Sequence, residues 1–214
     1  MFLKENDVVL FQGDSITDCG RDRSNPNSMG YGYPIRVAGE FNMLYPELNV
    51  RFYNRGVSGN RTWDLLDRWD AECTGFDPKP TVVSVYIGVN DTWRRFDNNQ
   101  ITTAQQYEEN YRKLLDDIKN KLSARIIMIE PYVLPNIATD EENWNEWRND
   151  LDAKIRVCRK LAVEYNALYL PLDGIFAQAY TKKQGTHWSA DGVHPTDAGH
   201  ALITENFMKL IGAK

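Results

Sequence analysis

Short runs of β-branched and apolar residues alternate along this chain with longer segments that show helical periodicity. The runs occupy residues 8–11, 50–53, 81–87, 125–129 and 167–170. When strands and helices alternate with short connections, the strands form a parallel sheet, and right-handed crossovers place the helices on both of its faces. The alternation therefore predicts an α/β protein, a three-layer αβα sandwich with a flavodoxin-like parallel sheet of about five strands.

The segments between these runs have the features of helices. Apolar side chains recur every three or four positions in residues 107–122 and 144–165, so each segment has one apolar face that needs a sheet to cover it. Pro34 suits the first turn of a helix that continues to residue 44. Thr62 is predicted to cap a helix that ends at residue 73, and Thr196 is predicted to cap the last helix.

Two segments, 20–33 and 131–142, are rich in proline and polar residues and are predicted loops. No internal repeat or linker divides the chain. With 42% hydrophobic residues, the 214 residues suffice for one domain with a sizeable core. We therefore expect a single domain over residues 1–214.

The charges exclude some classes of partner. The 30 acidic and 25 basic residues are mixed along the chain and give a formal net charge of −5. Because no basic stripe follows from this mixture, nucleic acid is not an expected partner.

The longest apolar runs, such as residues 126–129, are too short to cross a bilayer, so no membrane partner is expected. The first residues lack the features of a secretion signal, which favours a cytoplasmic protein.

The cysteines and the known cofactor motifs point away from a metal or cofactor. Cys19, Cys73 and Cys158 are odd in number, far apart and without a CxxC pair. This pattern favours reduced thiols over a disulfide framework or a zinc site. The chain also lacks a dinucleotide fingerprint, a Walker sequence and an HExxH motif. We therefore expect neither a cofactor nor a metal.

Ser15 follows the first predicted strand directly. In an open α/β sheet, ligands bind beyond the carboxyl ends of the strands, which is where this serine lies. Gly13 permits a tight turn before it, and a serine at the start of the next helix has its Oγ lifted into the crevice with its own N–H free. Taken alone, Ser15 is also explained as an ordinary helix cap.

Two further strand ends carry residues that suit ester hydrolysis. Gly59 follows the second strand and Asn90 follows the third. The backbone N–H groups of Ser15 and Gly59, with the side-chain amide of Asn90, could supply three donors to a developing oxyanion. For Gly59 and Asn90 a simple turn is the alternative, because glycine and asparagine are favoured in turns.

Asp191 and His194 stand three residues apart near the carboxyl end. On one tight turn Asp191 can hold the Nδ1–H of His194 and leave Nε2 to take a proton from Ser15. Each residue alone is more typical of a turn or a surface loop. Their combination with Ser15 favours a catalytic triad of Ser15, His194 and Asp191.

These segments resemble, in order, the four conserved blocks of the SGNH, or GDSL, hydrolases. The matching residues are Gly13-Asp14-Ser15, Gly59, Gly88-x-Asn90-Asp91 and Asp191-x-x-His194. The resemblance spans residues 8 to about 200, nearly the whole chain. It implies that Ser15 is the nucleophile, that His194 is the general base and that Asp191 orients the histidine.

The resemblance also implies an oxyanion hole made by Ser15, Gly59 and Asn90, and it supports the three-layer fold. Ile16 stands where the family name has leucine, which is a conservative change. Within the family, residues 13–20, 54–60 and 88–97 are most similar to the intracellular acetylxylan-esterase branch of the carbohydrate esterases.

Several residues near these blocks are candidates for the substrate pocket. We expect Trp188 to line it as a flat aromatic wall, and we assign Trp93 and Asp14 to the pocket as well. For His187, a place in the lining of the acyl pocket and a purely structural role are equal alternatives. Arg94 and Arg95 suit contacts with the alcohol part of a substrate, and a solvated or intersubunit salt bridge explains them equally well.

The sequence therefore predicts a serine esterase that cleaves short-chain carboxylic esters through an acyl-enzyme and acts on acetylated sugars such as xylo-oligosaccharides. A lysophospholipase or thioesterase with the same triad is one alternative, and a carbohydrate-binding pseudoenzyme is another. The expected partner is a small-molecule ester. Sequence spacing does not fix the acyl group, the sugar or the regiochemistry, because these depend on loops and surfaces. For the same reason the oligomeric state stays open, and a homo-oligomer is among the states left open.

Overall fold

The computed structural model describes residues 1–137 and 141–214 of the chain. Its centre is one parallel sheet of five strands in the order β2-β1-β3-β4-β5. The strands are β1 (Val8–Gly13), β2 (Arg51–Asn54), β3 (Val82–Tyr86), β4 (Arg125–Ile129) and β5 (Leu168–Leu170). Each predicted run forms one of these strands, and their order is that of flavodoxin-like folds, so the predicted sheet is confirmed.

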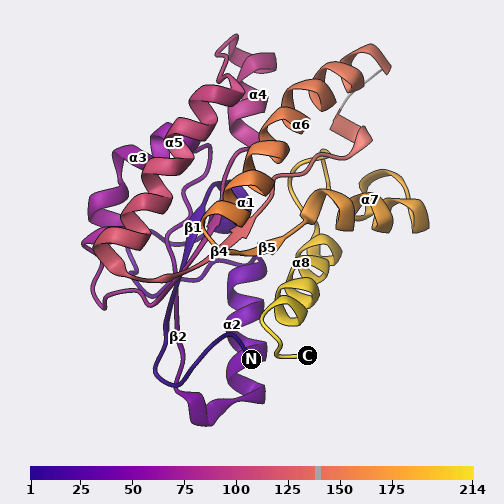
Figure 1. Ribbon diagram of the computed structural model, residues 1–214. Coiled ribbons are helices and arrows are strands. Elements are labelled where there is room, and N and C mark those ends of the chain that lie inside the picture. Colours follow the sequence, from indigo (N-terminus) through magenta and orange to yellow (C-terminus); the bar gives the residue numbers. More distant parts are fainter. Residues whose placement is uncertain (138–140) are drawn as a thin grey trace.

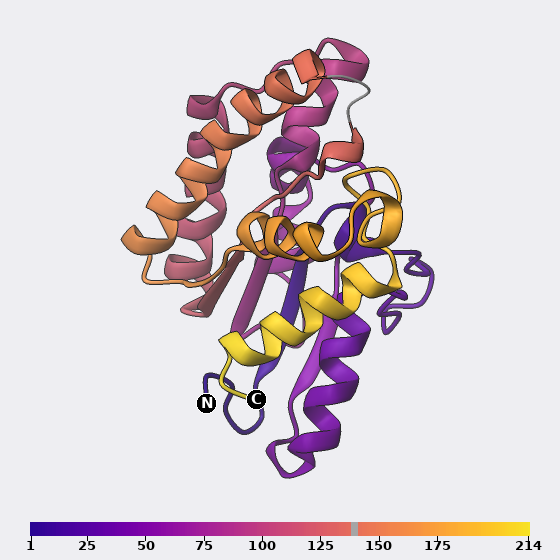
Figure 2. The ribbon, with the colours of Figure 1, turned by 90° about the vertical axis from the view of Figure 1, so that its right-hand side faces the viewer.

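Helices cover both faces of the sheet. In Figure 1 helices α2 and α8 lie together on one side, and helices α3, α5 and α6 lie on the other. Figure 2 shows α8 crossing in front of the strands beside α2. The helices are α1 (Ser15–Asp18), α2 (Tyr33–Leu44), α3 (Thr62–Asp67), α4 (Val89–Asn98), α5 (Ala104–Asp117), α6 (Glu141–Glu164), α7 (Leu172–Lys182) and α8 (Asp197–Leu210).

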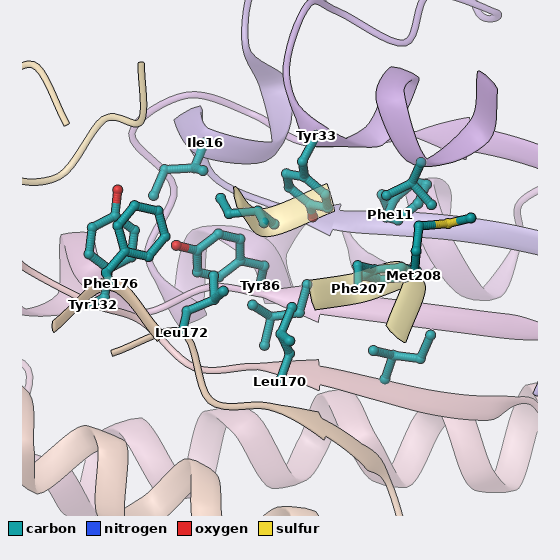
Figure 3. Packing of buried hydrophobic residues seen from close by; sticks show 14 of the residues in the cluster. Phe11, Ile16, Tyr33, Tyr86, Tyr132, Leu170, Leu172, Phe176, Phe207 and Met208 are labelled. Atoms are coloured by element: carbon teal, nitrogen blue, oxygen red, sulfur yellow. The ribbon is translucent and has the colours of Figure 1, made fainter. Parts of the chain in front are cut away.

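The strands separate two apolar clusters because successive side chains point to opposite faces. On β1, Val9 and Phe11 belong to the cluster beneath α2 and α8, whereas Leu10 belongs to the cluster beneath α3, α5 and α6. Figure 3 shows Phe11 and Phe207 packed together in the first cluster. Both faces of the sheet are therefore buried, which confirms the three-layer sandwich.

Some local expectations were wrong. Thr62 is the first residue of α3 and not its cap, because its hydroxyl donates to Asp91 (2.7 Å). Arg61 occupies the cap position, and its backbone N–H donates to the carboxylate of Asp64 (2.8 Å). Regular α-helix ends at residue 67, and a short π-helical segment, Asp70–Thr74, follows. Helices α4 and α7 were not predicted. Thr196 does cap α8, with its hydroxyl accepting the N–H of Gly199.

The first predicted loop is irregular from residue 20 to residue 32, and the second is irregular over residues 131–134. The first ends where α2 begins at Tyr33. Within the second, Pro135–Ile137 forms one turn of 3-10 helix and α6 begins at Glu141, while residues 138–140 lie outside the described residues. All three cysteines lie in the described ranges and form no disulfide there. No helix in the described ranges is long and apolar enough to cross a membrane.

The strand order places a crevice between β1 and β3. From β1 the chain continues to β2 on one side, whereas from β3 it continues to β4 on the other. The connections that leave the two adjacent strands therefore diverge, and ligands bind at such a switch point beyond the carboxyl ends of the strands. Ser15 follows β1 and Asn90 follows β3, so both lie at this crevice.

Candidate active site

Ser15 is held by the residues on either side of it. A Cβ atom at Gly13 would lie 2.3 Å from the hydroxyl oxygen of Thr17, so only glycine allows the turn that leads out of β1. Oδ1 of Asp14 accepts the N–H of Ile16 (3.0 Å) and caps α1. Ile16 is 1% exposed and packs into the core shown in Figure 3. The Ser15 backbone is therefore fixed on both sides.

Asp191 and His194 are joined within one tight turn. Oδ1 of Asp191 accepts the backbone N–H groups of Val193 (3.0 Å) and His194 (2.7 Å), and Oδ2 lies 2.6 Å from Nδ1 of the His194 ring. Burial opposes ionisation of this carboxyl, but the hydrogen bonds from His194 and Val193 outweigh it and lower the pKa of Asp191 to about 2. The carboxylate is ionised at neutral pH and holds the histidine ring.

The structure brings the three predicted triad side chains into one hydrogen-bonded chain. Nε2 of His194 lies 2.9 Å from Oγ of Ser15, at the opposite end of the ring from Asp191. Because the carboxylate accepts a hydrogen bond from Nδ1–H, the neutral ring carries its proton on Nδ1 and presents a free Nε2 lone pair to the serine. The hydrogen bond to Asp191 raises the pKa of His194 above its ordinary value of 6.5, against the opposing effect of burial.

The predicted oxyanion donors follow two neighbouring strands. Ser15 is the first residue of α1. Gly59 has a φ of +83°, a left-handed conformation that a residue with a side chain rarely adopts. The buried amide of Asn90 donates from Nδ2 to the carbonyl of Asn60 (3.1 Å), which ties the Asn90 side chain to the loop that carries Gly59.

One link between these loops was missed by sequence reasoning. Asp91 is fully buried, and its carboxylate accepts both the N–H (3.0 Å) and the hydroxyl (2.7 Å) of Thr62. Burial raises the pKa of Asp91 to about 6, although the hydrogen bonds from Thr62 oppose this. The only available signal was the position of Asp91 directly after Asn90, because Thr62 had been assigned a capping role.

A cavity of about 430 Å³ opens beside Ser15. Its wall includes Arg21 and Arg23 from a segment that sequence reasoning assigned only as a loop. Asp18 organises this wall, because its carboxylate accepts the N–H of Arg21 (3.1 Å), the N–H of Ser58 (2.9 Å) and the guanidinium of Arg23 (2.7 Å). The surroundings of Ser15 on this side are therefore polar and charged.

The two tryptophans assigned to the pocket have different neighbours. The Trp93 ring lies 5.7 Å from the His194 ring, centroid to centroid, and also contacts Trp147. The Trp188 indole donates to the carbonyl of Lys183 (2.9 Å) and packs edge-on against His187. In the ring contacts that the structure gives, Trp93 is thus the aromatic neighbour of the histidine, and a wall made by Trp188 stays a prediction.

The arginines after Asn90 both have partners within the chain. Arg94 forms a salt bridge with Asp97, and its guanidinium lies 3.9 Å from the position of a Cβ atom on Gly59. Arg95 forms a salt bridge with Asp150 on α6 (3.3 Å). Arg94 therefore lies against the candidate oxyanion loop, whereas Arg95 joins α4 to α6.

Asp14 lies beneath the site and does not line it. Its carboxyl is fully buried, and Oδ2 has no hydrogen-bond partner among the described residues. Burial raises the pKa of Asp14 to about 7, although the hydrogen bond from Ile16 and the charge of His194 oppose this. Asp14 is therefore a group that titrates close to neutral pH directly behind the serine.

No group of three or more His, Cys, Asp or Glu side chains in residues 1–137 and 141–214 is arranged to hold a metal ion. The hydrogen-bonded chain of serine, histidine and aspartate, with amide donors on neighbouring loops, is instead the arrangement that serine hydrolases use for acyl transfer.

Comparison with known proteins agrees with this geometry. Residues 11–202 match the model of the GDSL-like lipase/acylhydrolase family. The chain is 32% identical to an acetylxylan esterase from Geobacillus stearothermophilus over 99% of this chain and 97% of that protein. The crystal structure of that type of enzyme, Axe2 from the same organism, superposes with a TM-score of 0.89 at 33% identity over 99% and 97% of the two chains.

A crystal structure from Parabacteroides merdae, described as a GDSL-like lipase, superposes with a TM-score of 0.92 at 37% identity over 99% of this chain and 98% of that one. Further structures of Axe2 are described as catalytic mutants, one with a serine and one with an aspartate replaced by alanine. A family match over most of the chain and full-length likenesses above 30% identity leave one conclusion. The chain belongs to the GDSL-like lipase/acylhydrolase family and is an esterase with the SGNH hydrolase fold.

Proposed function

We propose that this protein is a serine esterase that removes acetyl groups from acetylated sugars such as xylo-oligosaccharides through an acyl-enzyme. The observation that carries the proposal is the hydrogen-bonded chain from Ser15 Oγ through His194 to Asp191, with distances of 2.9 and 2.6 Å. This chain can deprotonate the serine during attack and stabilise the imidazolium that results.

In the first half of the reaction, Ser15 Oγ attacks the carbonyl carbon of the ester while its proton passes to Nε2 of His194. Collapse of the tetrahedral intermediate breaks the bond to the sugar oxygen, which takes the proton back from His194 as it leaves. In the second half a water molecule attacks the acyl-serine, again with His194 as base, and acetate and the free serine are released. Asp191 remains ionised throughout and keeps the imidazolium oriented.

Negative charge develops on the carbonyl oxygen in both tetrahedral intermediates. We assign the N–H groups of Ser15 and Gly59 and the amide of Asn90 as its hydrogen-bond donors. Two observations support this assignment: the positive φ of Gly59, and the hydrogen bond that fixes the Asn90 amide to the same loop. Donors that are already oriented need no rearrangement when the charge appears.

Two observations support a sugar ester with a short acyl group. The full-length relative is an acetylxylan esterase. The cavity beside Ser15 is lined by Asp18, Arg21, Arg23 and other polar groups, which suit the hydroxyl groups of a sugar better than a long hydrocarbon chain. A lysophospholipase or a thioesterase for long acyl groups would need an apolar channel at this position.

The experiment is acetate release from acetylated xylo-oligosaccharides by the unmodified protein and by a Ser15→Ala variant. Ser15→Ala should abolish turnover while the circular dichroism spectrum and the melting temperature stay close to those of the unmodified protein. Ser24→Ala, which changes an exposed serine of the loop after α1, is the matched control and should retain full activity. Substantial turnover by Ser15→Ala would contradict the assignment, and binding of the sugars without turnover by the unmodified protein would favour the pseudoenzyme.

A further inference from the structure

A second cavity, of about 120 Å³, lies where α3 and α5 begin. It is lined by Trp63 of α3 and by Thr102, Gln106, Glu109 and Asn110, which precede or belong to the first turns of α5. This is smaller than the roughly 300–1,000 Å³ of pockets that enclose a drug-sized ligand. The cavity therefore suits a single ring and not a whole oligosaccharide.

Trp63 gives this cavity an aromatic wall that is already held in place. Its side chain is 45% exposed, although it is one of the largest apolar side chains of the protein. The Arg61 guanidinium lies over the indole ring, 4.6 Å from its centroid, and is fixed by Asp64 (2.8 Å) and Gln100 (2.6 Å). Because the ring is held before a ligand arrives, stacking against it costs little conformational entropy.

The remaining wall of the cavity offers both hydrogen-bond donors and hydrogen-bond acceptors. Thr102 is only 4% exposed, and its hydroxyl has no hydrogen-bond partner in the described part of the chain. Asn110 donates from Nδ2 to the hydroxyl of Thr62 (3.2 Å), and the Gln106 carbonyl accepts the N–H of Thr103 (2.9 Å). These bonds fix both amides. In the hydrogen bonds given for residues 1–137 and 141–214, the Asn110 carbonyl accepts none and the Gln106 nitrogen donates none, so one acceptor and one donor remain for a ligand.

The cavity lies on the same rim of the sheet as Ser15. Helices α3 and α5 pack against each other in Figure 1, and both begin on the side of the sheet where the parallel strands end. The connection to the candidate site is direct, because Thr62, the neighbour of Trp63, donates two hydrogen bonds to Asp91, the neighbour of Asn90.

We propose that this cavity is a sugar subsite, which binds one pyranose ring of the carbohydrate chain whose acetyl group reacts at Ser15. A flat aromatic ring next to a buried hydroxyl and to partly or fully exposed amide and carboxylate groups matches a pyranose, which has an apolar face of C–H groups and a rim of hydroxyls. An apolar segment of a partner protein fits less well, because four of the five lining residues are polar and would lose water without gaining partners. The inference rests on the proposed function for the identity of the sugar.

The first test measures binding without reaction. Unacetylated xylobiose, xylotetraose and xylohexaose, which an esterase cannot alter, are titrated into the protein in a calorimeter. Affinity should rise with chain length, and Trp63→Ala should weaken the binding of xylohexaose by about ten-fold, the loss of one aromatic stacking contact. Thr102→Val, which replaces the unpartnered hydroxyl by a methyl group of the same size, should also weaken it. Met43→Ala, at an exposed apolar residue of α2, is the matched control and should bind as the unmodified protein does.

The second test uses the reaction. The ratio of kcat/KM for acetylated xylotetraose to kcat/KM for acetylated xylose should fall towards one in Trp63→Ala, because only the longer substrate reaches the subsite. Sedimentation of each variant reports its oligomeric state. Three outcomes would overturn the subsite. The first is an unchanged affinity for xylohexaose in both Trp63→Ala and Thr102→Val, and the second is the absence of any binding by the unmodified protein. The third is a change of oligomeric state in a variant without a change in its affinity for the sugar. Normal binding without acetate release would refute the proposed deacetylation of sugars and leave the subsite standing.

Discussion

Thr62 donates two hydrogen bonds to the buried carboxylate of Asp91, one from its backbone N–H and one from its hydroxyl. Thr62 follows the loop that carries Gly59, and Asp91 follows Asn90, so this pair joins the two loops that carry candidate oxyanion donors. Removal of the carboxylate would leave two buried donors unsatisfied and would free the loops to move apart. We therefore assign Asp91 as a positioning residue.

Asp91→Ala should lower the free energy of unfolding by about 1–3 kcal/mol, the cost of an unsatisfied buried polar group. It should also lower kcat on acetyl esters, with a smaller effect on KM, because the oxyanion exists only after attack. Asp91→Asn keeps one acceptor oxygen for Thr62 and should lose less of both. Denaturant titration and steady-state kinetics measure the two effects. If kcat per folded molecule were unchanged in Asp91→Ala, the link would be purely structural.

The pH dependence of activity follows from the pKa of His194. Only the neutral ring can accept the Ser15 proton, and the hydrogen bond to Asp191 raises the pKa of His194 above 6.5. Thus kcat/KM should rise with pH through a single ionisation whose midpoint lies above 6.5. In Asp191→Asn the residual activity should show a lower midpoint, because the stabilising carboxylate is gone. A midpoint that did not move would indicate that another group controls this limb.

His194→Ala should reduce kcat more than Asp191→Ala does. The histidine transfers the proton in every step, whereas the aspartate orients the ring and stabilises its charged form, and in subtilisin loss of the base costs more than loss of the aspartate. Both variants should remain folded, because both side chains are only partly buried. Acetate release at saturating substrate provides the comparison. The reverse order would mean that a second carboxylate supports the histidine.

Asp14 should make stability fall as pH rises towards neutrality. Its pKa in the folded protein is about 7, above the ordinary 3.8, so between these values the folded state binds more protons than the unfolded state and loses stability as pH increases. Asp14→Asn, which stays neutral and keeps an acceptor for the Ile16 N–H, should flatten this decline. Denaturant titrations at several pH values between the two pKa values measure the slope. An equal slope in both proteins would show that Asp14 is not its source.

Acetyl esters should be preferred over esters of about eight carbons by at least about ten-fold, which corresponds to roughly 1.4 kcal/mol of differential transition-state binding. Trp93→Ala should narrow this preference more than Trp188→Ala, because the Trp93 ring lies against His194 while the Trp188 indole is bonded to the Lys183 carbonyl. A series of 4-nitrophenyl esters of increasing chain length gives the comparison. Faster cleavage of octanoyl than of acetyl esters by the unmodified protein would favour the lipid or thioester alternative.

Sequence patterns were sufficient where the determining interactions are local. The five apolar runs became the five strands, and the turn from Asp191 to His194 needs only neighbouring residues to form. The predicted capping role of Thr62 was wrong because the hydroxyl of Thr62 bonds instead to Asp91, which lies 29 residues further along the chain. The environments of Trp93 and Trp188 likewise depend on how helices and loops pack, which periodicity does not encode. The cavity beside Ser15 was missed because its arginines belong to a segment without regular structure.

The hydrogen bond between Ser15 and His194 closes a loop of 179 residues, from the end of the first strand to the last turn before α8. A nucleophile without its base is a weak one, so the chain is chemically inert until almost all of it has been synthesised and packed. A ribosome-bound chain that still lacks residue 194 cannot cleave the esters around it. Recovery of hydrolysis after dilution from denaturant therefore reports docking of the last segment onto the first, an event that recovery of helical signal alone does not detect.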